Sequence, residues 1–419
     1  MSRTIAASII KDPSLAPSGY QKLHWAREHM AVMNLLREDF RQNLPLKDMT
    51  ILCCLHLEAK TGNLLLSLQE AGAQVVACAS NPLSTQDDVV AALVDAGITI
   101  YAIHGESMEE YQQFLNMALD TEPDAIIDDG ADVISTLYKE RPTQVKTIIG
   151  ACEETTTGVV RLRAMEKDGT LKFPIIAVND AYMKYLFDNR YGTGQSVWDG
   201  INRTTNLIVA GKTVVVAGYG WCGKGIALRA KALGAQVIIT EIDPIKANEA
   251  LMDGHTVLPM ILAAKDGDVF ITVTGNINVI RKEHMLMMKD GAILSNAGHF
   301  DVEVSKPDLQ EISASHQIAR QNIEEYCLQD GRKIYLLAEG RLVNLAAGDG
   351  HPAEVMDLSF SLQALSLIHI VKHGREMKSE VYVVPESIDQ KIAYLKLQIE
   401  GVEIDTLSPE QTSYLNEWA

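Results

Sequence analysis

Short apolar runs alternate along the chain with longer stretches in which apolar residues recur every three or four positions. Runs of this length, separated by helical periodicity, are typical of parallel strands joined by helices. The pattern therefore predicts a parallel α/β sheet in the first half of the chain. The expected strands are 50–55, 74–79, 99–104, 124–128, 147–152 and 173–178.

A second alternating series begins at 212–218 and continues through 236–240, 268–274 and 291–296. Two such series predict two doubly wound parallel-sheet units, with a boundary near residues 182–195. A long helical stretch is expected after HPAEVMD. A further helix is expected at Ser408, where Ser-Pro-Glu-Gln has the pattern of a capping box.

A glycine-rich loop joins the first strand and helix of the second unit. The stretch VVVAGYGWCGKG places Gly218, Gly220 and Gly223 between an apolar strand and a helical stretch, and the next strand ends at Glu241. Such glycines permit a tight turn, backbone approach to a pyrophosphate and close packing of helix on strand, while the acid bonds the adenosine ribose. We therefore expect a Rossmann domain that binds NAD, because Glu241 would disfavour the 2′-phosphate of NADP.

Composition narrows the classes of partner. The formal net charge is −18 and the sequence pI about 5.0, with no visible basic patch, so we expect neither nucleic acid nor an anionic membrane as a partner. No apolar run approaches a membrane span, and we expect a cytoplasmic protein. The six cysteines show no metal-ligand spacing, so free thiols and no metal site are expected.

Polar residues follow several expected strands. Ligands of open α/β sheets bind at the carboxyl ends of strands, so a joint occurrence there favours a site over isolated helix caps. Beside a dinucleotide site, such groups suit redox chemistry coupled to proton transfer. A plain dehydrogenase and an NAD-responsive binding protein remain alternatives. The strand-end residues are His56, Asp128, Asp129, Glu153, Glu154, Asn179, Asp180, Asn296 and His299.

Between residues 50 and 360, ten segments together resemble the S-adenosylhomocysteine hydrolase (adenosylhomocysteinase) family. The resemblance implies a homotetramer and a nucleoside thioether substrate. It also implies a tightly held NAD that oxidises the ribose 3′-hydroxyl, so that homocysteine can be eliminated, water added and the hydride returned. The segments are HLEAKT, NPLSTQDD, IDDGAD, EETTTG, VNDAYMKYLFDNRYGTGQS, VVVAGYGWCGKG, TEIDP, NAGHFD, LLAEGRLVNLA and GDGHPAEVMD.

The resemblance assigns roles to five residues. Lys184 would deprotonate the 3′-hydroxyl with Asp188 beside it, and Asp129 would take the 4′ hydrogen. His56 would act as acid or base near the departing sulfur and attacking water. Glu154 would bond the ribose hydroxyls. Burial in a closed cleft is needed to bring Lys184 and Asp129 to working pKa values.

The resemblance also implies binding residues and a domain plan. A substrate domain, 1–183 completed by 350–385, would precede an NAD-binding domain, 184–349, and a C-terminal segment, 386–419. The implied cofactor ligands beyond Glu241 and the glycines are Thr155, Thr156, Thr157, Asn189, Asn276 and Asn344. The implied substrate ligands are Glu58, Lys60, Thr61, His299 and His351.

Several positions depart from the family pattern. Trp221 and Cys222 stand where an acid and valine are commoner, and Lys246 could weaken discrimination against NADP. The end of the chain lacks the lysine and tyrosine of the usual tail, which puts NAD affinity and exchange in question. Lys60 and Asp349 replace residues that line the purine pocket in better-known members.

The departure at Lys60 bears on the substrate. An ammonium only donates hydrogen bonds, so Lys60 at the purine edge would suit a 6-oxo group, and S-inosylhomocysteine is an alternative to the adenosyl compound. Lys60 could instead turn to solvent or pair with Glu58.

Overall fold

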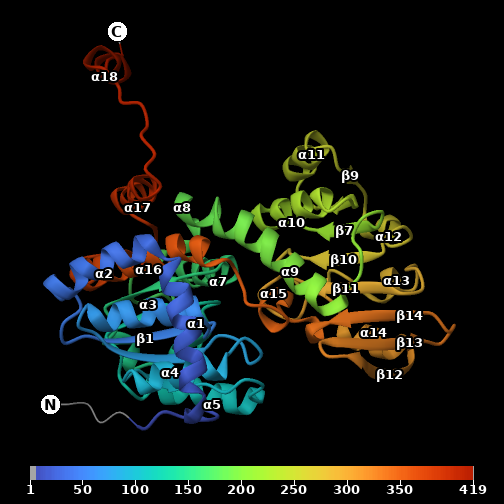
Figure 1. The fold of residues 1–419 in the computed structure, drawn as a ribbon, viewed down its shortest axis with the longest axis horizontal. Coiled ribbons are helices and arrows are strands. Elements are labelled where there is room, and N and C mark those ends of the chain that lie inside the picture. The colour runs from blue at the N-terminus through green and yellow to red at the C-terminus, as the bar shows by residue number, and fades with distance from the viewer. Residues whose placement is uncertain (1–5, 419) are drawn as a thin grey trace.

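The computed structural model describes residues 6–418, which form two lobes, each organised around its own sheet (Figure 1). The first sheet has seven parallel strands in the order β15-β6-β5-β4-β1-β2-β3. These strands are β1 (Thr50–Leu55), β2 (Gln74–Ala79), β3 (Thr99–Tyr101), β4 (Ala125–Asp128), β5 (Gly150–Glu153), β6 (Ile175–Ala177) and β15 (Val381–Val383).

Helices cover both faces of the first sheet. One apolar core joins the sheet to α1, α2, α3, α4 and α16, and the other joins it to α5, α6 and α7. This is the doubly wound arrangement that the alternating pattern predicts. The helices are α1 (Ala16–Glu28), α2 (Ala31–Asn43), α3 (Ala59–Glu70), α4 (Asp87–Asp95), α5 (Met108–Leu119), α6 (Asp132–Glu140), α7 (Thr156–Lys167) and α16 (Ala353–His373).

The expected strand 147–152 is displaced in the structure. It begins at Gly150 and ends at Glu153, and it pairs with β4 from Ala125 to Asp128. Ile148 and Ile149 are buried ahead of the strand, following a short 3-10 turn. An apolar run reports burial rather than backbone conformation, which explains the shift.

The second sheet has eight strands in the order β12-β13-β14-β11-β10-β7-β8-β9. The strands from β14 to β9 are parallel, as expected, whereas β13 runs antiparallel to both β12 and β14. These strands are β7 (Thr213–Ala217), β8 (Gln236–Thr240), β9 (Thr256–Val257), β10 (Val269–Thr272), β11 (Ala292–Asn296), β12 (Ser313–Arg320), β13 (Ile323–Leu328) and β14 (Lys333–Leu337).

The antiparallel edge was not part of the expectation. Strand β12 is mostly exposed, so it lacks the continuous apolar run that marks a buried strand. Short helices accompany the second sheet. They are α10 (Trp221–Ala232), α11 (Pro244–Met252), α12 (Met260–Ala263), α13 (Lys282–Met285), α14 (Lys306–Ile312) and α15 (Val343–Ala346).

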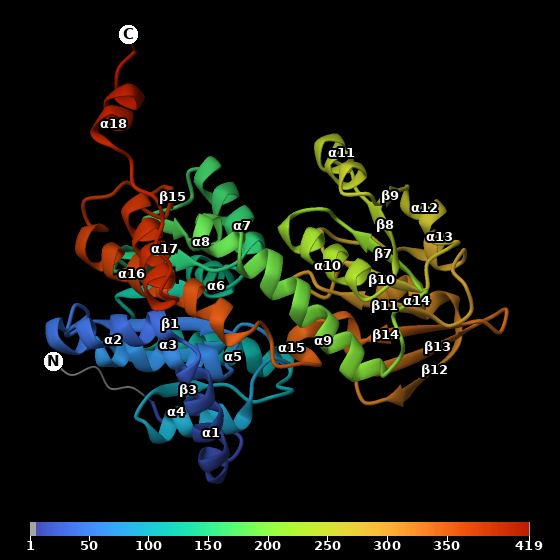
Figure 2. The ribbon, with the colours of Figure 1, turned by 45° about the horizontal axis from the view of Figure 1, so that its top comes forward.

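Two segments connect the lobes. The helix α8 (Tyr182–Tyr185) and a π-helical turn, Asp188–Gly192, lead into α9 (Thr193–Thr205), which runs from the first lobe to the second (Figure 2). After the second sheet the chain returns through α15 to α16 and adds β15 to the first sheet.

Helix α16 is the long helix expected after HPAEVMD. It is long and apolar enough to cross a membrane, but 72% of its most apolar stretch is buried against the rest of the protein. Helix α17 (Glu386–Ile399) packs on α16 and α2. Helix α18 (Pro409–Asn416) lies apart from both lobes, and its expected capping box at Ser408 is present.

Candidate active site between the two lobes

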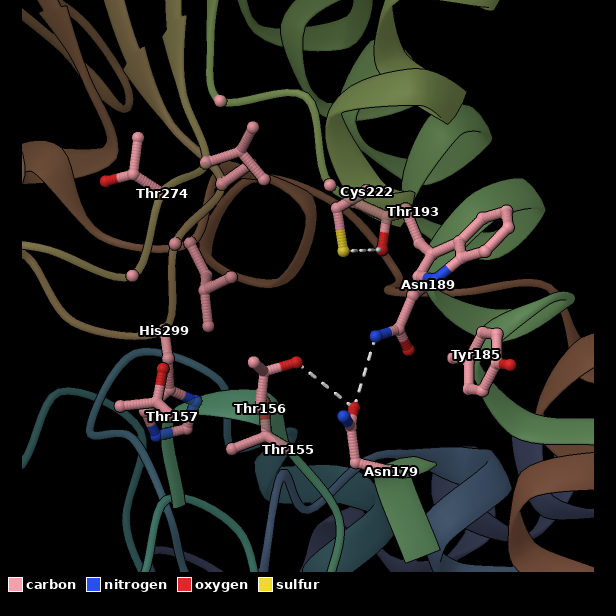
Figure 3. A pocket seen from close by; sticks show the side chains of 18 of the residues that line it. Thr155, Thr156, Thr157, Asn179, Tyr185, Asn189, Thr193, Cys222, Thr274 and His299 are labelled. Atoms are coloured by element: carbon pink, nitrogen blue, oxygen red, sulfur yellow. Dashed lines mark hydrogen bonds between the residues drawn. The ribbon is translucent and has the colours of Figure 1, made fainter. Parts of the chain in front are cut away.

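A cavity of about 1280 Å³ lies between the lobes and is lined by both. Figure 3 shows Thr155, Thr156 and Thr157 from the first lobe across the cavity from Thr193 and Cys222. Of the residues given a catalytic, cofactor or substrate role from the sequence, the cavity lining within residues 6–418 contains all except Gly223. The strand-end candidates Asp128, Glu153 and Asn296 do not line it. The fold therefore brings together strand ends that are far apart along the chain.

The glycine loop has the expected geometry. Strand β7 ends at Ala217 and α10 begins at Trp221, so the amino end of the helix opens into the cavity. Gly218 has a φ of +104° that other residues rarely adopt. A Cβ on Gly223 would lie 2.0 Å from the Gly218 carbonyl oxygen, so Gly223 acts through packing, which explains why it does not reach the cavity.

Glu241 is fixed at the end of β8 by the loop itself. Its carboxylate accepts hydrogen bonds from the backbone amides of Tyr219 (2.7 Å), Ile242 (2.7 Å) and Asp243 (3.1 Å). The side chain therefore ties the glycine loop to the next strand while lining the cavity. Asn276, which follows β10, also lines the cavity, and Asn344 donates to Ser196 Oγ at 3.2 Å.

An imidazole–carboxylate pair lies at the ends of β1 and β4. His56 Nε2 is 3.2 Å from Asp129 Oδ2, and His299 Nδ1 from the second lobe is 3.7 Å from Asp129 Oδ1. The other nitrogen of His56 lies 2.8 Å from Ser84 Oγ, which fixes the ring. Burial lowers the pKa of His56 to about 4 against the opposing effect of Asp129, so the imidazole is neutral near pH 7.

Lys184 is the centre of a second buried cluster. Its Nζ lies 3.4 Å from both Glu154 Oε1 and Asp188 Oδ1, and it donates to Asn189 Oδ1 at 2.9 Å and to Asn179 Oδ1 at 3.3 Å. Figure 3 shows Asn179 bonded to both Asn189 and Thr156. The side chain that looks like a surface lysine from its local sequence is 4% exposed.

Burial and the neighbouring charges shift the pKa values of Lys184, Glu154 and Asp188. Burial opposes the charged form of Lys184, but the carboxylates of Asp188 and Glu154 outweigh it, and its pKa is raised. The expectation that burial would bring the pKa of Lys184 to a working value was therefore wrong, because it left out these two carboxylates. Burial raises the pKa of Glu154 to about 7, partly offset by Lys184. The pKa of Asp188 is lowered, because Lys184 and His351 overcome the burial of its carboxylate. Glu154 is thus the carboxyl of the cluster that exchanges a proton near pH 7.

Two residues of α16 orient this cluster and were missed in the sequence. Ser359 donates to Asp188 Oδ2 at 2.7 Å, and Gln363 donates to Glu154 Oε2 at 2.6 Å. Both are completely buried. Their spacing of four residues, on one face of a long and mostly apolar helix, is the signal that could have found them.

Two strand-end acids have structural roles instead. Glu153 accepts from the amides of Gly130 (2.8 Å) and Ala131 (3.1 Å), and Asp128 accepts from the amide of Ile134 (2.9 Å). These bonds shape the loop that carries Asp129 and the start of α6. Burial raises the pKa of both carboxyls, to about 7 for Asp128.

Lys60 does not turn to solvent. It is 7% exposed, and its Nζ lies 2.6 Å from Glu58 Oε2 and donates to the backbone carbonyl of Asp349. Glu58 also caps α3 by accepting from the amides of Lys60 and Thr61. The Asp349 side chain is 81% exposed and lies 3.8 Å from Arg203, so its carbonyl, not its carboxylate, takes part.

His351 lies between Thr193 and the Lys184 cluster. Its Nε2 lies 3.1 Å from Thr193 Oγ1, and its Nδ1 lies 3.5 Å from Asp188 Oδ1. Burial lowers its pKa, partly offset by Asp188. A neutral ring here is suited to donating and accepting hydrogen bonds at the cavity wall.

Comparison with known proteins identifies the family. A model of the S-adenosyl-L-homocysteine hydrolase family matches residues 7–147, and a model of that hydrolase's NAD binding domain matches residues 189–350. The chain is 61% identical to adenosylhomocysteinase of Thermococcus kodakarensis, over 98% of this chain and 97% of that protein. It is 58% identical to adenosylhomocysteinase of Aquifex aeolicus, over 98% of each chain. S-inosyl-L-homocysteine hydrolase of Methanococcus maripaludis is also 58% identical, over 98% of this chain and 99% of that protein. The chain belongs to the S-adenosyl-L-homocysteine hydrolase family and is a hydrolase with NAD as its cofactor.

Proposed function

We propose that the protein hydrolyses S-adenosyl-L-homocysteine reversibly to adenosine and L-homocysteine. One observation carries the proposal: the Lys184 cluster and the His56–Asp129 pair open into the same cavity as the glycine loop. A thioether on an unactivated carbon is a poor leaving group. NAD, when bound, supplies temporary oxidation of the substrate ribose and thereby the missing activation.

Lys184 is the base for the ribose 3′-hydroxyl. To accept that proton it must first be neutral. Of the two carboxylates that lie 3.4 Å away, Glu154 is the better proton acceptor, because its pKa is about 7 whereas that of Asp188 is lowered. Ser359 and Gln363 hold the two carboxylates in place around the lysine. The arrangement supports proton transfer inside the cluster without exchange with solvent.

Asp129 is the base for the 4′ hydrogen, and His56 serves the departing sulfur and the attacking water. The 3.2 Å contact between them allows a proton taken by one to be passed to the other. His299 approaches Asp129 from the second lobe and contacts the homocysteine end of the substrate. NAD is bound by Thr155, Thr156, Thr157, Asn189, Asn276 and Asn344. The nucleoside is bound by Glu58, Thr61 and His351.

Glu241 favours NAD over NADP. A 2′-phosphate beside its fixed carboxylate would bring like charges together in a partly enclosed site. Lys246 also lines the cavity, but it lies 3.8 Å from Asp243, which offsets its charge. Measured affinities of the protein for NAD and NADP at matched salt test this preference.

The purine preference is tested by homocysteine release from S-adenosyl- and S-inosyl-homocysteine at matched concentrations. The Lys60 ammonium is already engaged by Glu58 and a carbonyl, which supports adenine as the base over a lysine-selected 6-oxo purine. Lys60→Gln is expected to leave the preference for the adenosyl compound in place. Faster release from the inosyl compound in the parent, reversed by the substitution, would contradict the proposal.

We also propose a homotetramer of the chain. Large apolar side chains are exposed on α11 of the second lobe, including Ile245, Leu251 and Met252. Such a cluster on a monomer is typical of an interface. Sedimentation equilibrium of the full chain with NAD measures the assembly, and a monomeric mass would contradict it.

A further inference from the structure

Trp221 is the first residue of α10 and lines the cavity beside Gly220. Its ring centroid lies 5.3 Å from that of Tyr185, with an angle of 31° between the planes. On the same ring the Lys224 ammonium lies 4.3 Å from the centroid, and the Arg190 guanidinium lies 5.9 Å away. The indole is therefore held by one aromatic and two cationic neighbours.

These neighbours come from different elements. Tyr185 belongs to α8 and directly follows Lys184, whereas Lys224 is one turn further along α10. Lys224 is itself fixed by a 2.6 Å ion pair with Glu249 of α11. Trp221 thus joins the connection between the lobes to the loop that receives the dinucleotide.

The position of the Trp221 indole at the start of α10 determines which part of a bound dinucleotide it can cover. The free amides at the amino end of a helix bind phosphates, and in a Rossmann domain they hold the pyrophosphate. A flat ring at the first residue of that helix lies where it can cover the pyrophosphate from solvent. Leaving this position would break the contact with Tyr185 and the cationic contacts, which are each favourable.

We propose that Trp221 is a cofactor-retaining residue: its indole, held between Tyr185 and Lys224, covers the bound dinucleotide and must leave Tyr185 before NAD dissociates. The inference rests on the proposed placement of the NAD pyrophosphate at the glycine loop. It adds to the proposed function a residue that governs how long the cofactor stays bound.

The first test is the rate of NAD exchange. The holoenzyme is mixed with a large excess of 1,N6-etheno-NAD, and bound fluorescence is followed after rapid gel filtration. Trp221→Ala is expected to release NAD roughly tenfold faster than the parent, as loss of the aromatic contact and the two cationic contacts implies. Tyr185→Leu is expected to show part of that acceleration, and Trp221→Phe less than Trp221→Ala.

The matched control is Trp25→Ala, because Trp25 is 69% exposed on α1. It is expected to release NAD at the parent rate. Melting temperatures of all variants separate faster release from unfolding. A parent rate of release in Trp221→Ala would overturn the proposal.

Energy transfer from tryptophan to bound NADH gives a readout independent of turnover. Trp221→Phe is expected to lose a larger share of this transfer than Trp25→Phe does, and equal losses would overturn the proposal. The hydrolytic function is judged separately by homocysteine release from the parent. Failure of that release with slow NAD exchange intact would reject the proposed reaction and leave the role of Trp221 standing.

Discussion

The two lobes contribute to one cavity by different chemistry. The first lobe presents ionisable side chains at the ends of its strands, where burial lowers the pKa of His56 to about 4 and raises the pKa of Glu154 to about 7. The second lobe presents a glycine turn, a helix amino end and a carboxylate held by backbone amides. Its polar contribution is mostly fixed by the backbone.

This difference separates binding from proton transfer. A site formed by backbone amides binds its ligand with little dependence on pH, since amides do not titrate. A site of buried, mutually interacting acids and bases depends on every partner in the cluster. We therefore expect substitutions in the first lobe to change rate and pH dependence, and substitutions in the second to change cofactor affinity.

Lys184→Ala tests this division most strongly. Loss of the base is expected to lower kcat on the order of 10³-fold, while NAD remains bound because the glycine loop is intact. Homocysteine release and the amount of NAD per chain after gel filtration are the measurements. The control is Lys167→Ala at the exposed end of α7. Normal turnover of Lys184→Ala would remove the lysine from the mechanism.

Asp129→Asn is expected to interrupt the reaction at a later point. The 3′-oxidation depends on the Lys184 cluster and should proceed, whereas removal of the 4′ hydrogen should slow about 10²-fold. Reduced nicotinamide absorbance is then expected to accumulate after substrate is added. Elimination of homocysteine at the parent rate would show that Asp129 is not the base.

Two glycines of the second lobe form a matched pair. Among the described residues, and apart from its two chain neighbours, Gly220 has no heavy atom within 4 Å of an added Cβ, whereas a Cβ added at Gly223 would lie 2.0 Å from a carbonyl oxygen. Gly223→Ala is expected to destabilise the protein by about 1–3 kcal/mol through overpacking. Gly220→Ala is expected to keep the parent melting temperature without NAD but to bind NAD more weakly, because the methyl group occupies the backbone's approach to the pyrophosphate.

Thermal melting without cofactor and NAD titration separate the two effects. Equal melting temperatures for both variants would contradict the packing role of Gly223. Unchanged NAD affinity in Gly220→Ala would contradict the close approach of the dinucleotide to this turn.

The second lobe's site was easier to predict than the first lobe's cluster. The glycine spacing and Glu241 lie within one strand–helix–strand unit, so local sequence determines their geometry. The Lys184 cluster needs Gln363, 179 positions away along the chain, and periodicity marks that residue only as part of a buried helix. The antiparallel β12 was missed because an exposed edge strand carries no apolar run.

Roles taken from strand ends alone were also incomplete. Asp128 and Asp129 are adjacent, yet Asp128 accepts from the amide of Ile134, whereas Asp129 contacts His56 from the neighbouring strand end. The sequence pattern selected the region but could not separate a structural carboxylate from one that lines the cavity. That distinction depends on which backbone amides the loop turns toward each side chain.

The smallest expected effect concerns Gln363, which acts on substrate only through Glu154. Its amide donates to Glu154 Oε2 and thereby lowers the pKa of a carboxyl that burial raises to about 7. Removing the donor in Gln363→Leu disfavours the charged carboxylate, so the pKa of Glu154 rises by about one unit. If an ionised Glu154 must accept the proton of Lys184, hydrolysis increases with pH through this pKa, and the acid limb of kcat moves from about 7 to about 8.

The fold of Gln363→Leu should persist, because the Gln363 carbonyl oxygen has no hydrogen-bond partner within the described residues. Ser359→Ala is the control: it removes a donor from Asp188 instead and is expected to leave the limb in place. Parent-like pH profiles of kcat for both variants would show that α16 supports the cluster without changing the pKa of Glu154.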